Sequence, residues 1–485
     1  MKRLVRHPSR LMALVLALPA FAALAACEVD ADPDALSEPV ATAESGLFMD
    51  SSTTLWPGGW VPVCWTAVSQ AKPDFATFSA RVKRVVEDQW GRVAGLNFTG
   101  WGACPASTKG IIAINMDDVG GNSDAGGFGF FTGTRTLRFG RDRNNDGVIL
   151  HEFGHELGFR HEFARPDFPD HDGCTGENGS TGNNFGTQPD DDSIMATTYC
   201  NSRTTLSRWD IVGVQRAYGR KHAGSLVGLG GRCMNISGGT TQIGSPFIAW
   251  PCVGAPNDTF ATSFPLSHNL AFSTIIQNVG RCLNISGGVV DPNGATPIIS
   301  WDCVSGAPNE ELAAQGVQLR AMGDQCVVAT GTAAGATLQV QNCGTTPVAR
   351  ERWDFFGPRL RLSGTNLCAS VPAAVNGLGT MISLRTCEAA GWRQGFTFAA
   401  GEIRDTSSAK CWNVSGGVMT PGSPVALWDG CGNGLDNEYF HTVGTFGFGG
   451  QCVDMHGGVS FDGAAIGMFP CVAGAKNQEW DYHWK

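Results

Sequence analysis

Three histidines and a glutamate share one eleven-residue segment, HEFGHELGFRH. On a helix, His151 and His155 lie one turn apart, so both imidazoles face the same way and can bind one metal ion. Glu152 would lie beside that ion, where a carboxylate can accept a proton from water. Gly158 can adopt the left-handed conformation that ends a helix, and the returning chain would then supply His161 as the third ligand.

Three protein ligands leave one coordination position open for water, as a catalytic zinc site requires. Zinc would lower the pKa of that water toward ~7 and polarise a scissile carbonyl. Glu152 would act as the general base and later deliver the proton to the leaving amine. We therefore predict one catalytic Zn²⁺ and hydrolysis of peptide bonds. Two alternatives stay open: a histidine-rich surface helix, and a domain that binds zinc without activity.

The surrounding sequence predicts one α+β domain over residues 47–220. Apolar residues recur near the helical period from Phe75 to Leu96. Asp146 occupies the place of an N-cap for the zinc helix. The expected elements are strands at 60–65, 110–116 and 136–139, a helix at 75–96, the zinc helix from 146, and a closing helix at 206–218.

The eleven-residue segment matches the metzincin motif H-E-x-x-H-x-x-G-x-x-H in full, and its continuation, GFRHEFARPD, resembles the astacin branch. The resemblance implies a Met-turn under the zinc, with Met195 as its methionine. It also implies a substrate-aligning edge strand, which we place at residues 127–130, and a glutamate that binds the mature N-terminus, at Glu162. Astacins carry a tyrosine as an additional zinc ligand two residues after the methionine, where this sequence has Thr197.

The second half of the chain, from Gly230 onward, repeats one unit six times at intervals of 41–49 residues. Each unit begins with a short strand into a cysteine and has a second cysteine 17–21 residues later. A repeat this regular indicates one architecture copied, in which no copy can bury its apolar face alone. The expected cysteine pairs are Cys233 with Cys252, Cys282 with Cys303, Cys326 with Cys343, Cys368 with Cys387, Cys411 with Cys431, and Cys452 with Cys471.

These units close on positions such as Gln478-Glu479-Trp480 and resemble the ricin-B type β-trefoil lectins. Three units make one trefoil, so the resemblance implies trefoils at 221–356 and 357–485. In that family a sugar pocket uses an acidic residue after the first cysteine, an aromatic residue before the second, and an asparagine beside the Q-x-W position. The sixth unit has all three of these residues: Asp454, Phe469 and Asn477.

Three further units have asparagine in place of the acidic residue. An aromatic face can stack on a sugar ring while polar groups bind its hydroxyls. Alternatively, these side chains are only core and turn residues of the trefoils. We expect units three and four to be structural only, since they lack the pocket residues. The candidate sugar-binding residues are Asn235, Trp250 and Asn257 in unit one, Asn284, Trp301 and Asn309 in unit two, and Asn413, Trp428 and Asn437 in unit five.

The N-terminal residues predict an export signal. Basic residues precede an apolar run that ends before Cys27, which is typical of a signal peptide over residues 1–26. The stretch LAAC resembles the bacterial lipobox and implies lipid on Cys27; an ordinary signal peptide is the alternative. Residues 27–46 are acidic and rich in Ala and Pro, and we expect a tether or short pro-segment there. The only expected membrane contact is this lipid anchor.

The chain has 17 cysteines, and a lipidated Cys27 would account for the odd number. Cys64 and Cys104 could pair in the first part of the peptidase domain, and Cys174 and Cys200 after the zinc helix. An even, regularly spaced set in an exported chain favours disulfides over metal binding.

The predicted fold class is multidomain: an α+β metzincin-like zinc peptidase domain, then an all-β half of two β-trefoils. We expect an exported zinc-dependent endopeptidase that acts on proteins or peptides and binds glycans through its trefoils. It would be a bacterial outer-membrane or cell-surface lipoprotein, or secreted. A net charge of −10 without a basic run argues against nucleic acid as a partner. The alternatives are a carbohydrate-binding lectin or adhesin with a vestigial metal domain, and a peptidoglycan amide hydrolase.

Overall fold

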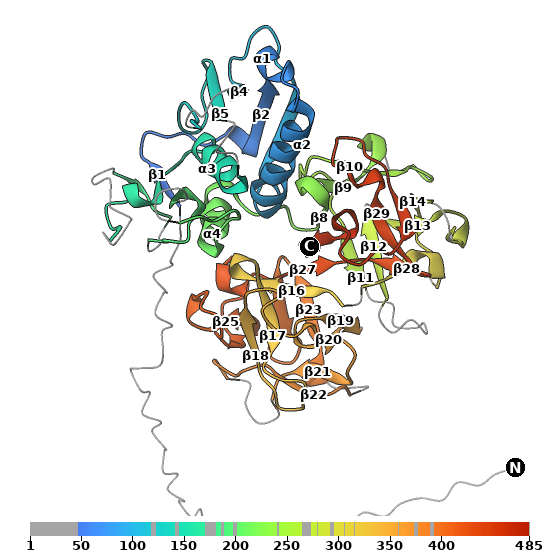
Figure 1. Cartoon of the computed structure of the whole chain (residues 1–485). Helices are drawn as coiled ribbons and strands as arrows, with labels where there is room; N and C mark the ends of the chain where they lie inside the picture. The colour runs from blue at the N-terminus through green and yellow to red at the C-terminus, as the bar shows by residue number, and fades with distance from the viewer. Residues whose placement is uncertain are drawn as a thin grey trace, which may run out of the picture. The chain divides into compact units, whose positions relative to one another are not determined.

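The computed structural model describes residues 47–484 with internal gaps (Figure 1). The residues outside the description in that span are 118–122, 141–144, 170–180, 186–188, 197–200, 240–241, 264–272, 279, 292–294, 305, 315, 357, 373–376 and 389–391. The predicted signal peptide, tether and Cys27 lie outside the described residues, as do Cys174 and Cys200. No helix among the described residues is long and apolar enough to cross a membrane.

The N-terminal domain is built on a sheet of four parallel strands in the order β3-β2-β4-β5. The strands predicted at 60–65, 110–116 and 136–139 are all confirmed. The remaining strand was not predicted, because two glycines interrupt its apolar pattern, NFTGWGA. The bounds are β2 Trp60–Trp65, β3 Asn97–Ala103, β4 Ile112–Asp117 and β5 Arg135–Gly140.

Four α-helices accompany this sheet: α1 Ala67–Gln70, α2 Phe75–Val86, α3 Asp146–Glu156 and α4 Arg208–Tyr218. The helix predicted over 75–96 is α-helical only as far as Val86, and a π-helical turn follows at Glu87–Gly91. That turn directs Trp90 into the core, where its indole N–H donates to the Leu150 carbonyl at 3.0 Å. The zinc helix α3 is therefore fastened to the end of α2.

A second, small sheet pairs β1 (Phe48–Asp50) with β6 (Phe159–Arg160) and β7 (Gly182–Asn183). Phe48 lies opposite Arg160, directly after the zinc helix. This pairing fixes the path of the chain between the second and third predicted ligands.

The remaining strands form two bodies (Figure 1). One contains β8 Leu226–Val227, β9 Cys233–Ile236, β10 Phe247–Trp250, β11 Ala261–Ser263, β12 Ser273–Asn278, β13 Arg281–Ile285, β14 Thr296–Asp302, β15 Glu311–Ala313, β28 Gly447–Phe448, β29 Gln451–Met455, β30 Ile466–Pro470 and β31 Trp480–Tyr482. The other contains β16 Gln318–Ala321, β17 Gln325–Ala329, β18 Leu338–Gln341, β19 Trp353–Phe356, β20 Arg359–Leu362, β21 Leu367–Ser370, β22 Ser383–Thr386, β23 Phe396–Ala399, β24 Glu402–Asp405, β25 Cys411–Val414, β26 Val425–Trp428 and β27 His441–Gly444.

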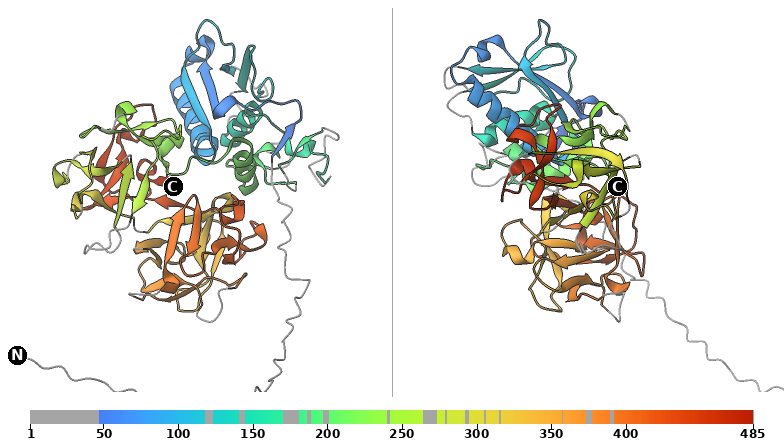
Figure 2. Two further views of the ribbon diagram at one scale, coloured as in Figure 1. Left: turned by 180° about the vertical axis from the view of Figure 1, so that it is seen from behind. Right: turned by 90° about the vertical axis from the view of Figure 1, so that its right-hand side faces the viewer.

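The strand pairings show that units one, two and six share one trefoil. In it, β14 pairs with β30, and β31 pairs with β8. A further bridge joins Ile248 of unit one to Ala465 of unit six. Figure 1 accordingly shows the red strand β29 among the green and yellow-green strands of units one and two, and the view from behind in Figure 2 shows the same mixture of colours.

Units three, four and five share the other trefoil. Bridges join Thr337 to Ser383, Gln339 to Pro424, and Met381 to Ala426, so each unit contacts both of the others. We call the first body the outer trefoil (226–313 with 447–482) and the second the inner trefoil (318–444). The division expected from the repeat, 221–356 and 357–485, differs from this nested arrangement. Every unit carries the same cysteines and core positions, so the repeat does not specify which units close together.

Side chains at the Q-x-W positions connect the end of a unit to its cysteine-bearing strands. Trp480 and Trp353 are fully buried, and each indole N–H donates to a carbonyl of the strand after the first cysteine, at 2.9 Å in both units. In unit six, the residue at the Q position, Gln478, accepts from the Val472 N–H after the second cysteine at 2.8 Å; in unit five, the corresponding Gly432 N–H donates to Glu402 instead. These two contacts explain in physical terms why the sequence repeats there.

Candidate metal centre and carbohydrate pockets

The helix α3 is closed at both ends by specific hydrogen bonds. Its N-cap is Asn145, whose side chain accepts from the Val148 N–H at 2.9 Å; the predicted cap, Asp146, is instead the first helical residue. At the other end, Trp56 donates to the Glu156 carbonyl at 2.7 Å, and the Tyr218 hydroxyl donates to the next carbonyl, also a helix-end acceptor. The ligand-bearing helix is thus fixed by its own N-cap and by two side chains from elsewhere in the domain, Trp56 and Tyr218.

The three predicted zinc ligands come together. After α3 ends, Gly158 adopts a φ of 106°, a left-handed value that favours glycine. The chain then turns back, and the ring centroids of His151, His155 and His161 lie 4.7, 5.2 and 4.9 Å apart pairwise. One ligand atom from each residue lies within 4.8 Å of the others. Neither the histidine-rich surface helix nor a loose cluster describes this geometry, because His151 and His155 are buried.

The donor set fits a zinc ion. The Nδ1 atom of His151 lies 2.9 Å from the Ile194 carbonyl, and that of His155 lies 2.7 Å from the Phe159 carbonyl. A carbonyl can only accept, so each Nδ1 carries the proton and each Nε2 keeps a lone pair for a metal. Burial lowers the pKa of His151 to about 4, which favours the neutral imidazole that binds metals.

Glu152 is nearly buried, with 8% of its surface exposed. Burial, followed by the nearby charge of Asp124, raises the pKa of Glu152 to about 8, while a hydrogen bond from the Ala125 backbone opposes that rise. A cation held by the three histidines would act in the same direction as the Ala125 hydrogen bond: it would lower the pKa of Glu152 and favour the ionised carboxylate. Glu152 directly follows His151 in α3.

The Met-turn forms beneath the histidines. Met195 is fully buried in the short turn Ile194–Ala196, and the main chain of this turn holds His151 through the Ile194 carbonyl. A Cβ atom built on Gly154 would lie only 2.3 Å from the Met195 sulfur. The zinc helix and the Met-turn can therefore approach this closely only because residue 154 has no side chain.

Replacement of Gly154 with alanine should consequently push the Met-turn away. We expect a loss of about 1–3 kcal/mol in the free energy of unfolding, typical of an overpacked core, together with weaker zinc binding. Thermal unfolding and zinc titration would measure the two effects. Gly102→Ala is the control, because a Cβ there meets nothing within 4 Å; equal behaviour of the two variants would contradict the prediction.

A buried aspartate that the sequence did not reveal holds the Met-turn in place. Asp210 accepts from the Ser193 hydroxyl at 2.6 Å and from the Ile194 N–H at 2.8 Å. It also forms a capping box with Ser207 at the start of α4. Burial, followed by the charge of Asp190, raises the pKa of Asp210 to about 7. Only the capping-box pattern Ser207-x-x-Asp210 could have drawn attention to it.

The edge strand also differs from the expectation at 127–130. The antiparallel bridge to β5 falls at Asp124, opposite Arg138, with backbone hydrogen bonds of 3.0 and 2.8 Å. The predicted segment turns away instead, and its Gly129 donates to the His155 carbonyl at 3.1 Å. Glycines cause this turn, since Gly129 has a φ of 63°.

The pocket residues of the trefoils lie on one face of a hairpin. In unit six, Asp454 lies opposite Gly467, and Phe469 follows two residues later on the same face. Phe469 is 38% exposed, and Asn477 donates to Asp454 at 2.8 Å. The predicted acidic, aromatic and amide groups of this unit thus converge.

Units one, two and five repeat this arrangement with asparagine. Asn235, Asn284 and Asn413 lie opposite residues two positions before Trp250, Trp301 and Trp428, respectively. Trp250 is 41% exposed, Trp301 is 39% exposed, and Trp428 is half-buried. The second asparagines also close on the hairpins: Asn257 donates to Asn235 at 2.8 Å, Asn309 to the Ile285 carbonyl at 3.1 Å and Asn437 to the Val414 carbonyl at 3.4 Å.

Comparison with known protein families agrees with both halves of this geometry. Residues 88–197 match the model of astacin, peptidase family M12A, and residues 272–396 and 399–485 match the ricin-type β-trefoil lectin domain. The chain joins an astacin domain to ricin-type trefoils. No curated protein sequence matches it.

The solved structures that match the chain include proteins similar to each half. The hatching enzyme zinc-protease HCE-1 of the medaka fish Oryzias latipes is 18% identical, and the match covers 35% of this chain and 94% of that one with a TM-score of 0.26. The agglutinin of Abrus precatorius is 17% identical over 45% and 95% of the two chains, with a TM-score of 0.22. The β-trefoil lectin of the Vibrio vulnificus hemolysin/cytolysin, solved with N-acetyl-D-lactosamine bound, is 15% identical over 26% and 93%, with a TM-score of 0.21.

In the astacin domain, the glutamate after the third histidine is enclosed. Glu162 and Arg165 are both buried, and Arg165 Nη1 lies 3.2 Å from Glu162 Oε1. The Asp190 N–H also donates to that oxygen, at 3.1 Å. Thr197, the position of the astacin tyrosine, lies outside the described residues.

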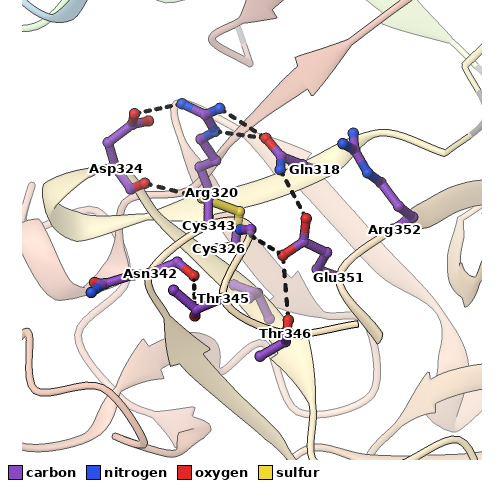
Figure 3. Close-up of a disulfide and its surroundings, with 12 residues drawn as sticks. Gln318, Arg320, Asp324, Cys326, Asn342, Cys343, Thr345, Thr346, Glu351 and Arg352 are labelled. Carbon is purple, nitrogen blue, oxygen red and sulfur yellow. Dashed lines mark hydrogen bonds and ion pairs between the residues drawn. A yellow bond between two sulfur atoms is a disulfide. The ribbon is translucent and has the colours of Figure 1, made fainter. Parts of the chain in front are cut away.

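In the ricin-type trefoils, unit three has a network of polar and charged side chains around its disulfide and its Q position, Glu351. Figure 3 shows Arg320 between Asp324 and Gln318, and Gln318 in turn donating to Glu351 at 3.2 Å. The position that corresponds to Asp454, two residues after the first cysteine, is Val328 in unit three and Ser370 in unit four. The absence of the pocket's acidic or amide residue at these two positions is the reason why units three and four are predicted to be structural only.

Seven of the predicted disulfides are present among the described residues. They join Cys64 to Cys104, Cys233 to Cys252, Cys282 to Cys303, Cys326 to Cys343, Cys368 to Cys387, Cys411 to Cys431, and Cys452 to Cys471.

Proposed function

We propose that this protein is an exported zinc-dependent endopeptidase whose trefoils bind glycans and hold it near glycan-bearing substrates. The observation that carries the peptidase is the convergence of His151, His155 and His161 beside Glu152, with Met195 beneath them. The exposed aromatic side chains of the hairpin faces support sugar binding. Disulfides in both halves support export to an oxidising compartment, with lipid on Cys27 as the proposed anchor.

The proposed reaction is addition of water to a peptide carbonyl. Zinc held by the three histidines would supply Lewis acidity at the water and the carbonyl oxygen. Glu152 takes one proton from the attacking water as its oxygen bonds to the carbonyl carbon. It then gives that proton to the amide nitrogen as the C–N bond breaks. The carbonyls of Ile194 and Phe159 keep the imidazoles in one tautomer and one orientation throughout.

Removal of the metal tests this proposal directly. Chelator treatment of the purified protein should abolish cleavage of casein and of a quenched peptide library, and zinc should restore it, because the proposed reaction depends on zinc to activate the water and polarise the carbonyl. A parallel assay on purified peptidoglycan separates a peptidase from an amide hydrolase. Binding of one zinc without cleavage of any of these substrates would contradict the proposed activity and favour the lectin.

Glycan binding has its own expected result. Phe469→Ala should weaken binding at unit six by about 0.5–1.5 kcal/mol, because the ring supplies the stacking face. Isothermal titration with N-acetyl-D-lactosamine and methyl α-D-galactoside would measure the change. Phe461→Ala is the control: it is also an exposed phenylalanine of unit six, 52% exposed, but lies in the loop before the second strand of the hairpin. Equal affinities of the two variants would count against the pocket.

A further inference from the structure

The hydrogen bonds of unit six show which of two buried side chains donates to the other: Gln478 donates to Asp454. The amide of Gln478 accepts from the Val472 N–H through Oε1, so its Nε2 is the group that donates to Asp454 Oδ2, at 2.9 Å. Asn477 donates to the same carboxylate oxygen at 2.8 Å. Asp454 is thereby held by two donors on one oxygen, and its other oxygen remains for a ligand hydroxyl.

Units two and five exchange the residue types of this pair. In unit two, Glu310 stands at the Q position and accepts from the Val304 N–H at 2.9 Å and from the Asn284 amide at 3.0 Å. In unit five, Asn413 donates to Glu438 at 3.3 Å. A carboxylate can only accept, so each asparagine must turn its NH₂ group toward the glutamate. Its carbonyl oxygen then takes the place of the second Asp454 oxygen.

A second observation points to a ligand at unit five. Asn413 is fully buried, and its Oδ1 atom has no hydrogen-bond partner among the described residues. A buried oxygen without a partner is costly, and a ligand hydroxyl would satisfy it. Trp428 lies on the same face of the hairpin.

We propose that Glu310 and Glu438 are positioning residues of the sugar pockets. Each fixes an asparagine so that units two and five accept a sugar hydroxyl on an uncharged amide oxygen, where unit six uses a carboxylate. Each pair joins one amide to one carboxylate. In the Asn–Glu pairs the charge lies on the residue at the Q position, and in the Asp–Gln pair it lies on the residue that faces the sugar. This inference rests on the proposed glycan binding and identifies which residues orient the acceptor.

A reciprocal exchange in unit five tests the proposal. The full-length variants are Asn413→Asp, Glu438→Gln, and both together, which recreates the pair of unit six. Asn413→Asp alone places two carboxylates in contact and should lower the melting temperature, and the second substitution should restore it. The mirror cycle in unit six, Gln478→Glu rescued by Asp454→Asn, covers the case in which the Asn413→Asp variant fails to fold.

Sugar binding provides the readout that a merely structural pair would not change. In a background of Trp250→Ala, Trp301→Ala and Phe469→Ala, titration with N-acetyl-D-lactosamine and methyl α-D-galactoside reports unit five alone. Each single exchange should weaken binding at least about tenfold, a loss of 1.4 kcal/mol. The double exchange should return it to within about threefold of the starting value, and Trp428→Ala should abolish it.

The outcomes separate the two proposals. Rescue in both the melting temperature and the titration supports the positioning role. Additive effects on the melting temperature overturn it, because the pair would then not be reciprocal. If melting is rescued but neither probe binds to the unsubstituted protein, glycan binding itself fails and the positioning role with it, although the reciprocal pair stands.

Discussion

The Glu152→Gln variant should bind one zinc ion and cleave almost nothing. Glu152 lies beside the three histidines without being one of the converging ligands, so the amide should leave the metal in place. It cannot accept the proton of the attacking water, and general-base catalysis contributes on the order of 10²–10⁴-fold in rate. Peptide cleavage rates and metal analysis on the same sample would measure both parts of the prediction.

Two controls make this result specific. His155→Ala should lose zinc and activity together, because it removes a ligand. Glu388→Gln, on an exposed residue of unit four, should change neither. Activity retained in Glu152→Gln would show that another group takes the proton.

The second large effect concerns the nested trefoils. Trp480→Ala should destabilise the outer trefoil by about 3–5 kcal/mol, the usual cost of removing a large buried aromatic side chain. Trp480 is fully buried and donates to the Val453 carbonyl. Hydrogen exchange followed by mass spectrometry should therefore show faster exchange in residues 226–313 and 447–482.

Trp353→Ala is the matched control, since it removes the same side chain from unit three. Its effect should fall on residues 318–444. If Trp480→Ala instead accelerates exchange across 357–485, the two trefoils are contiguous halves and the nested arrangement is wrong.

The sequence predicted the metal centre because its chemistry is local. Three histidines and Glu152 lie within one helix and one turn, and their spacing alone brings them together. Asp210 could not be predicted in the same way, because its contacts with Ser193 and Ile194 cross between separate elements. The prediction of the edge strand was wrong for a related reason. Glycines in the sequence indicate that a turn exists, but they do not indicate that pairing with β5 falls at Asp124.

In the trefoil half too, features within one repeat could be predicted from the sequence, whereas contacts between distant repeats could not. Strands, cysteine pairs and pocket residues recur within each unit, and the disulfides predicted among the described residues are present. Which three units close around one axis depends on contacts such as Ile248 with Ala465, between residues far apart in the chain. The cysteines and core positions recur in every unit, so periodicity alone cannot decide which units close together.

The nested trefoils also set an order of events as the chain is made. Units one and two emerge first but lack a third partner until residues 447–482 have followed the whole inner trefoil. The inner trefoil can close from consecutive units, whereas units one and two of the outer trefoil stay open during the synthesis of about 130 further residues. Contacts of such long range form slowly, and unpaired strands are prone to aggregate in the meantime. Residues 447–482 therefore decide when the outer trefoil can close: only a chain that includes them can cover the strands of units one and two.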